Sequence, residues 1–150
     1  MKNNIKGFKI RKATAKDIKL ITSIQKMDGF KHAYYLTSAR LRELFKRGEI
    51  FFIAFINKEP VGFTSLYIET RARLHFLSVI NKYAKMGIGS SLLEKIINET
   101  KKKKKNMIYV YTECGSPIEK FFIKKKFKKS GYFNNRFGKG KHANIFTFYL

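Results

Sequence analysis

The sequence has one cysteine, two prolines and no tryptophan among its 150 residues. Cys114 alone can form neither an intrachain disulfide nor a cysteine zinc site, so we expect a reducing compartment and no metal. No apolar run reaches the roughly 18 residues that a membrane-spanning helix needs. The first residues are charged and no apolar stretch follows them, so no signal peptide is predicted. These absences favour a cytoplasmic protein that does not enter a membrane.

Acidic residues are also scarce: 10 stand against 33 lysines and arginines, which gives a net charge of +23. A surface this basic should attract polyanions such as nucleic acid. The alternative is compositional, because 26 lysines, 17 isoleucines and 9 asparagines together show the bias that an AT-rich genome produces. Lysine outnumbers arginine 26 to 7, whereas phosphate recognition favours arginine. The charge alone leaves both interpretations open.

The hydrophobic content of 44% predicts a folded chain, and without a linker, repeat or composition break we expect one domain over residues 1–150. The apolar spacing predicts the order β-α-α-β-β-β-α-β-α-β-β. This order indicates an α/β (α+β) fold with a mixed, mostly antiparallel central sheet and helices on both faces. Strands are predicted at 8–11, 50–56, 61–68, 74–79, 107–111, 127–133 and 143–149, and a turn is predicted at 57–60. Helices are predicted at 38–47 and 118–125, and two further helices are expected to begin after Thr14 and after Gly89.

One stretch has the pattern of a phosphate-binding turn: a strand that ends at Val79 leads to Gly87-Ile88-Gly89, which opens a helix. Two glycines let the backbone approach a ligand, and the helix N-terminus offers free amides and a positive dipole end. Lys82 and Lys85 add positive charge beside it. The dinucleotide-binding fingerprint is not met, because its third glycine is missing and the preceding strands look antiparallel. A glycine turn without a ligand is the alternative.

With these features the sequence resembles the GNAT superfamily of acyl-CoA N-acyltransferases over nearly its whole length. The family's central motif, Gln/Arg-x-x-Gly-x-Gly/Ala after a β-strand, corresponds to Ala84 through Gly89. A later motif, an Ala-x-x-Phe-Tyr-x-x-x-Gly-Phe helix, corresponds to Ile118 through Phe127. The resemblance implies a GNAT fold and an N-acetyltransferase that moves an acetyl group from its cosubstrate acetyl-CoA directly to a primary amine, without a metal.

The resemblance also implies where acetyl-CoA binds. In this family the strand before the glycine turn separates from its neighbour at a bulge, and the cosubstrate lies in the gap. By position, residues 77–79 would pair with the pantetheine arm, the amides of 85–90 would hold the pyrophosphate, and two phenylalanines would flank the arm near the thiol. The implied cofactor-binding residues are Leu77, Ser78, Val79, Lys82, Lys85, Met86, Gly87, Ile88, Gly89, Ser90, Phe121 and Phe122.

Two residues depart from the family pattern. Ala84 replaces the usual Gln/Arg, which removes one contact on the phosphate side. Phe122 takes the place of a tyrosine that protonates the leaving CoA thiolate in many relatives, and phenylalanine has no proton to donate. Another group or a water would then donate the proton, or none is needed. The departures also fit an alternative function, a catalytically degenerate CoA-binding or basic nucleic-acid-binding module on the same fold.

Amine acetylation needs a group that takes the amine proton. His75, on the strand that leads to the glycine turn, is one candidate base because histidine titrates near neutral pH. Glu69, at the end of the preceding strand, is the second candidate. Ser116 is a candidate proton donor, and its alternative role is to cap the helix ahead of Pro117. The alternatives for the two bases are a packed histidine and a solvated surface charge.

The acceptor amine would bind between segments 28–35 and 134–142, which mix aromatic and basic residues. Aromatic core residues among solvated charges are the alternative. The acceptor could be a small molecule, a protein amine or the amine of a charged tRNA, and the basic surface makes a polyanionic acceptor worth considering. A homodimer that pairs through the strand 145–149 is a further hypothesis. The sequence does not determine which acceptor is used.

Overall fold

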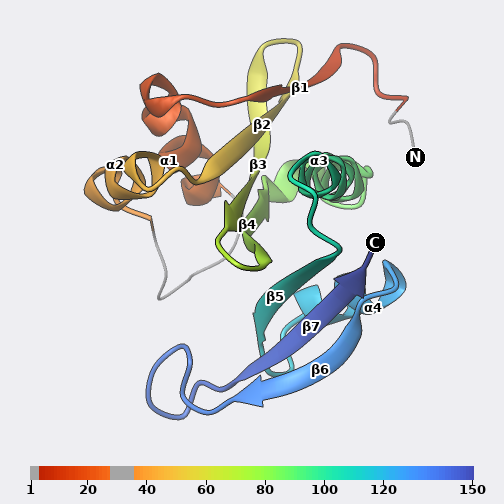
Figure 1. Cartoon of the computed structure of the whole chain (residues 1–150). Coiled ribbons are helices and arrows are strands. Elements are labelled where there is room, and N and C mark those ends of the chain that lie inside the picture. The colour runs from red at the N-terminus through yellow and green to blue at the C-terminus, as the bar shows by residue number, and fades with distance from the viewer. Residues whose placement is uncertain (1–3, 28–35) are drawn as a thin grey trace.

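Seven strands form one sheet in the order β1-β2-β3-β4-β5-β7-β6 in the computed structural model, which describes residues 4–27 and 36–150 (Figure 1). Every neighbouring pair is antiparallel except β4 and β5, which are parallel. The strands are β1 (Phe8–Lys12), β2 (Ile50–Ile56), β3 (Glu59–Ile68), β4 (Ala72–Val79), β5 (Met107–Glu113), β6 (Lys128–Phe133) and β7 (Ala143–Tyr149). The helices are α1 (Ile18–Met27), α2 (Ser38–Lys46), α3 (Ile88–Lys102) and α4 (Ile118–Lys124), with short 3-10 turns at Ala15–Asp17 and Asn81–Tyr83.

The predicted order of elements and the mixed, mostly antiparallel sheet are confirmed. The predicted turn at 57–60 is too long. Asn57 and Lys58 both have positive φ, 47° and 72°, as a tight two-residue hairpin requires, and β3 already begins at Glu59. The hypothesis of a homodimer through strand 145–149 stays a prediction. Within the chain β7 pairs with β5 along its whole length and with β6 from Ala143 to Thr147, so most of the strand has no free edge for a second copy.

Helices cover both faces of the sheet, as predicted (Figure 1). The apolar stripes of α1 and α2 bury Ile21 and Leu41 against one face, while α3 buries Leu92 against the other. Each such fully buried side chain stabilises the fold by roughly 1.5–3 kcal/mol. Gly62 of β3 permits the close packing of α3, because a Cβ there would lie 3.0 Å from the Ser78 carbonyl oxygen and 3.2 Å from Leu92.

The strands β4 and β5 separate soon after they begin. Their register contains only two pairs, Ala72 with Ile108 and Arg73 with Tyr109. From there β4 stays paired with β3 and β5 stays paired with β7, and the two strands diverge (Figure 1). The sheet is therefore open in its middle, and this opening positions the candidate site. No helix within 4–27 and 36–150 combines the length and apolar content that crossing a membrane requires.

Candidate active site

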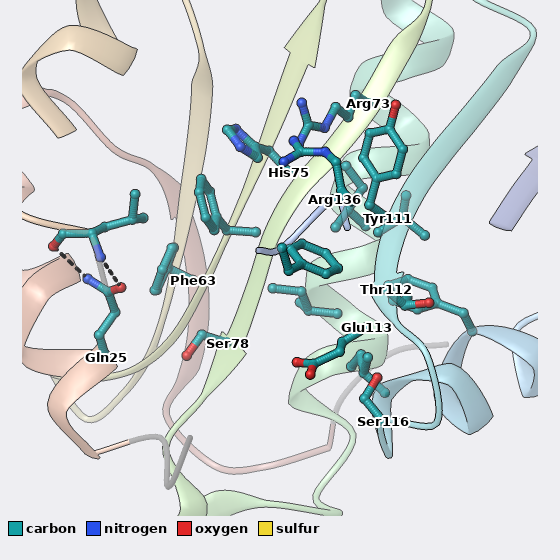
Figure 2. A pocket seen from close by; sticks show the side chains of 18 of the residues that line it. Gln25, Phe63, Arg73, His75, Ser78, Tyr111, Thr112, Glu113, Ser116 and Arg136 are labelled. Atoms are coloured by element: carbon teal, nitrogen blue, oxygen red, sulfur yellow. Dashed lines mark hydrogen bonds between the residues drawn. The ribbon is translucent and has the colours of Figure 1, made fainter. Parts of the chain in front are cut away.

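A cavity of about 470 Å³ lies between the diverging strands. The β4 residues from Arg73 to Ser78 form one wall, and β5 with the start of α4 forms the other. Figure 2 shows Arg73, His75, Arg136 and Tyr111 near one end of the cavity, and Ser78, Glu113 and Ser116 near the other. The cavity therefore has a basic, aromatic end and an end with hydroxyl and carboxylate groups.

A β-bulge in β4 presents His75 at this cavity. Ser65 pairs with Phe76 and Leu66 pairs with Leu74, so His75 is the extra residue of the strand. The Thr64 hydroxyl donates to the Phe76 carbonyl at 2.7 Å and holds the strand just beyond the bulge. The imidazole ring packs against the Phe76 ring, tilted by 30° with ring centroids 3.9 Å apart. The ring is therefore held in place by its own strand and by the neighbouring one.

Glu49, directly ahead of β2, lies behind the imidazole. Its Oε1 atom is 2.8 Å from His75 Nδ1 and accepts a hydrogen bond from the Ser65 hydroxyl at 2.6 Å. The Glu49 side chain is only 1% exposed, against 16% for His75. Because a carboxylate only accepts hydrogen bonds, Nδ1 carries the proton and Nε2 keeps a lone pair. The pair thus has the arrangement of an oriented base.

The pKa of His75 lies below its ordinary value. Burial is the main cause, because it disfavours the charged imidazolium, and the hydrogen bond to Glu49 opposes this shift. The charge of Arg73 lowers the pKa further. A lowered pKa keeps the ring neutral at pH 7, which is the form that can accept a proton.

The opposite wall is fixed by Glu119 of α4. Its carboxylate accepts from the Thr112 hydroxyl at 2.8 Å, the Gly115 amide at 2.9 Å and the Asn144 amide group at 2.7 Å. Burial alone would raise the pKa of Glu119, but these hydrogen bonds outweigh it and hold the pKa below its ordinary value. The carboxylate thereby ties α4 to β5 and β7 and fixes the wall on which Ser116 lies.

Ser116 and Phe122 line this wall. The Ser116 hydroxyl is buried and has no hydrogen-bond partner among the described residues. It does not cap α4, contrary to the alternative role, since Pro117 occupies the cap position and no side chain bonds there. Phe122 is 1% exposed and packs on Phe127, so it shapes the wall without offering a polar group. Ser116 therefore contributes to this wall a buried hydroxyl that makes no hydrogen bond with the described residues.

The glycine turn forms the start of α3. Gly87 has a φ of 82° and caps the helix, and Lys85 has a φ of 63°. The first bond of the helix runs from the Ser91 amide to the Gly87 carbonyl, so the amides of residues 88–90 have no helical acceptor. These amides and the positive end of the helix dipole can bind an anion. Residues 82–90 do not line the cavity and lie beyond its Ser78 end.

The structure brings together only some of the residues that the sequence proposed. Leu77, Ser78, His75, Ser116 and Phe122 line the cavity. The other residues proposed to bind the cofactor lie outside the lining of the cavity. They are Val79, Lys82, Lys85, Met86, Gly87, Ile88, Gly89, Ser90 and Phe121.

Phe121 and Glu69 are placed elsewhere. The Phe121 ring lies over the glycine turn, 3.6 Å from where a Cβ of Gly89 would be. Glu69 is exposed, accepts from the Tyr67 hydroxyl at 3.0 Å and does not line the cavity. Of the two proposed bases, only His75 is in the cavity.

Sequence reasoning missed Glu49. The available signal was a lone carboxylate between Gly48 and a wholly apolar strand, which is an uncommon place for an unpaired charge. Segment 28–35, proposed for the acceptor, lies outside the described residues. From the second proposed segment, 134–142, Arg136 and Phe137 line the cavity. In the described part of the chain, no group of three or more His, Cys, Asp or Glu side chains is placed to hold a metal ion.

Comparison with known proteins gives the family. The sequence profile of the acetyltransferase (GNAT) family matches residues 18–127. The chain belongs to the GNAT acetyltransferase family. A search of the curated proteins gives no significant match to this GNAT chain.

Solved structures agree with the GNAT fold. Ard1 from Thermoplasma volcanium superposes with a TM-score of 0.84 at 20% identity, covering 96% of this chain and 98% of that one. The ribosomal-protein-S18-alanine N-acetyltransferase from Escherichia coli gives a TM-score of 0.82 at 17% identity, with 95% and 94% covered. The PaiA N-acetyltransferase from Thermoplasma acidophilum, solved in complex with coenzyme A, gives 0.76 at 20% identity, with 95% and 99% covered. At these identities the likeness concerns the fold.

Proposed function

We propose that this GNAT chain transfers the acetyl group of acetyl-CoA to a primary amine. The observation that carries the proposal is the buried Glu49–His75 pair, which places a neutral imidazole on the cavity between the diverging strands. A histidine with only a packing role would not need to face an open cavity, whereas the bulge places His75 in the cavity lining. A base oriented by a carboxylate is what amine deprotonation requires.

The described residues fit acetyl-CoA as the cosubstrate. Beyond Arg73, β4 presents a strand edge that β5 does not pair with, which suits the amide groups of a pantetheine arm. Where this edge ends, the amides of residues 88–90 at the start of α3 suit a pyrophosphate. Acetyl-CoA supplies an activated acetyl group as a thioester. The residues that we propose to hold it include Ser78, Gly87, Gly89 and Phe122.

The transfer needs a group that takes the amine proton and a group that stabilises the leaving sulfur. His75 Nε2 takes the proton that the amine loses as its nitrogen bonds to the thioester carbonyl carbon. The carbon–sulfur bond breaks, and its electron pair stays on sulfur. The sulfur then leaves as a thiolate, and we propose that the Ser116 hydroxyl, which lines the opposite wall, donates a hydrogen bond to it, which Phe122 cannot do. Glu49 stabilises the imidazolium that forms on His75.

The test combines binding with turnover. Calorimetry should show micromolar acetyl-CoA binding that persists at about 0.5 M salt, where the general attraction of a +23 protein for anions is screened. Thiol release with a panel of amines then measures turnover. We expect His75→Gln to lower kcat about 100-fold, the lower range for a general base, while acetyl-CoA affinity is kept. Arg42→Gln is the control, because Arg42 is an exposed residue of α2 outside the cavity lining.

A second candidate function is CoA binding without turnover. Phe122, which lacks the hydroxyl of the family motif, favours it. It predicts that acetyl-CoA binds, that no amine in the panel is acetylated, and that His75→Gln changes nothing. Binding that disappears at high salt would contradict both candidates and favour a basic nucleic-acid-binding module.

A further inference from the structure

The cationic residues of the cavity differ from those of the rest of the surface. Of the 26 lysines in the sequence, none among the described residues lines the cavity, whereas three of the 7 arginines do. These three are Arg40, Arg73 and Arg136. A compositional bias toward lysine does not place arginines selectively at one cavity. Arginine differs from lysine in its planar fork of donors, which binds carboxylate and phosphate groups with two hydrogen bonds.

Two of these arginines lie close together without an anion. The guanidinium carbons of Arg73 and Arg136 are each 4.9 Å from the centre of the Tyr111 ring, and Figure 2 shows both side chains near that ring. Arg40 is already paired with Glu43 at 2.9 Å. In the described part of the chain, no carboxylate lies within ion-pair distance of Arg73 or Arg136.

The Arg73 guanidinium is also incompletely hydrogen-bonded. Its Nε atom is buried and has no acceptor among the described residues. Burial lowers the pKa of Arg73, and the neighbouring charge of Arg136 lowers it further. Cation–π attraction to the Tyr111 ring stabilises each guanidinium separately. It does not explain why two cations are held together, since like charges in a partly buried site repel each other.

We propose that Arg73 and Arg136 form an anion subsite for the acceptor, and that the acceptor is a small primary amine that also carries a carboxylate or phosphate group. This inference rests on the proposed acetyl transfer. Arg73 and His75 are only two residues apart on β4, and both line the cavity. An acceptor with its amine at His75 and several bonds between amine and acid would span both groups.

The test uses matched probes on the CoA-loaded protein, titrated by NMR at about 0.3 M salt. The carboxylate pair is 4-aminobutyrate and butylamine, and the phosphate pair is O-phosphoethanolamine and ethanolamine. We expect at least one probe with an acid group to bind about 10- to 100-fold more tightly than its partner without that group, as charge-assisted hydrogen bonds produce. Arg73→Gln and, separately, Arg136→Gln should abolish this preference.

Arg42→Gln is the control, because it removes the same charge from an exposed position of α2 outside the cavity. Equal binding of the probes with and without the acid group in both pairs would overturn the subsite. So would an equal loss in Arg42→Gln and Arg73→Gln, which would indicate a general attraction of small anions to the basic surface. Thiol release with the same probes separates the two proposals. Specific binding without acetylation would support the anion subsite and contradict the transferase, whereas acetylation without acid preference would do the reverse.

Discussion

The two ends of the cleft between β4 and β5 are built from different parts of the chain. At the glycine turn, the groups offered to a ligand are backbone amides from consecutive residues, and a positive φ at Gly87 shapes them. At the other end the groups are side chains, and His75, Tyr111 and Arg136 come from three separate segments. The first end depends on local conformation, and the second depends on the whole sheet. Substitutions should therefore separate cosubstrate binding from chemistry.

The largest expected effect is at the glycine turn. Gly89→Asp should weaken acetyl-CoA binding about 100-fold or more, because its carboxylate would lie among the amides proposed to hold the pyrophosphate. The fold should be kept, since a Cβ at Gly89 meets Phe121 at an ordinary 3.6 Å and acidic residues suit the first turn of a helix. Calorimetry on Gly89→Asp and on Asn98→Asp, an equal charge change at an exposed position of α3, measures the effect. Equal affinities would show that the pyrophosphate binds elsewhere.

A smaller and different effect is expected at the other end. Glu49→Gln should keep acetyl-CoA affinity and lower kcat about 10- to 100-fold, because the amide can bond Nδ1 in either tautomer and does not stabilise the imidazolium. The pH profile sharpens this prediction. The wild-type rate should fall as pH drops through the pKa of His75, which lies below 6.5. Glu49 raises that pKa, so its loss should move the acidic limb to still lower pH.

Glu99→Gln is the control for this pH profile, because Glu99 is a carboxylate of α3 whose ion pair with Lys102 is long, at 3.9 Å. The two variants should differ in both kcat and the position of the acidic limb. A limb that stays in place in Glu49→Gln would mean that another group is the base. A stability loss alone would leave the limb unmoved, so the profile distinguishes positioning from folding.

The same contrast explains how much the sequence could predict. The element order follows from helical and strand periodicity, and the glycine turn is read from a strand, two glycines and an apolar helix in succession. The hairpin turn was overestimated because Pro60 looked like a turn residue, although it pairs with Phe55 in the sheet. Proline is tolerated there because the register shifts between Ala54 and Phe55, beside the hairpin.

The side-chain end could be predicted only in part. His75 was found from its strand and residue type, but its partner was not, because the pairing depends on a bulge that no local pattern specifies. Glu69 was favoured by its nearness along the sequence, and the structure places it outside the cavity. Arg136 meets Tyr111 only after β7 and β5 have paired. Such contacts become visible once the register of the whole sheet is known.

The smallest effect on the rate should come from Ser116. Substitution of a second serine, Ser65, gives a comparison for the direction of its effect on stability. Ser65 donates to Glu49 at 2.6 Å, so Ser65→Ala should destabilise the fold by about 1.5–3 kcal/mol, the range for a hydrogen bond to a charged group. The buried Ser116 hydroxyl has no partner, so Ser116→Ala should leave stability unchanged or raise it by up to about 1 kcal/mol. Denaturant unfolding measures both changes.

Ser116→Ala should nevertheless lower kcat several-fold with acetyl-CoA, because this hydroxyl is the group that we propose to donate a hydrogen bond to the leaving sulfur. Single-turnover measurements separate this chemical step from product release. If kcat is unchanged while stability rises, the thiolate leaves without help from this wall. The groups that take part in the reaction would then lie on β4 alone. The opposite wall would contribute only its shape and, through β5, the Tyr111 ring on the acceptor side.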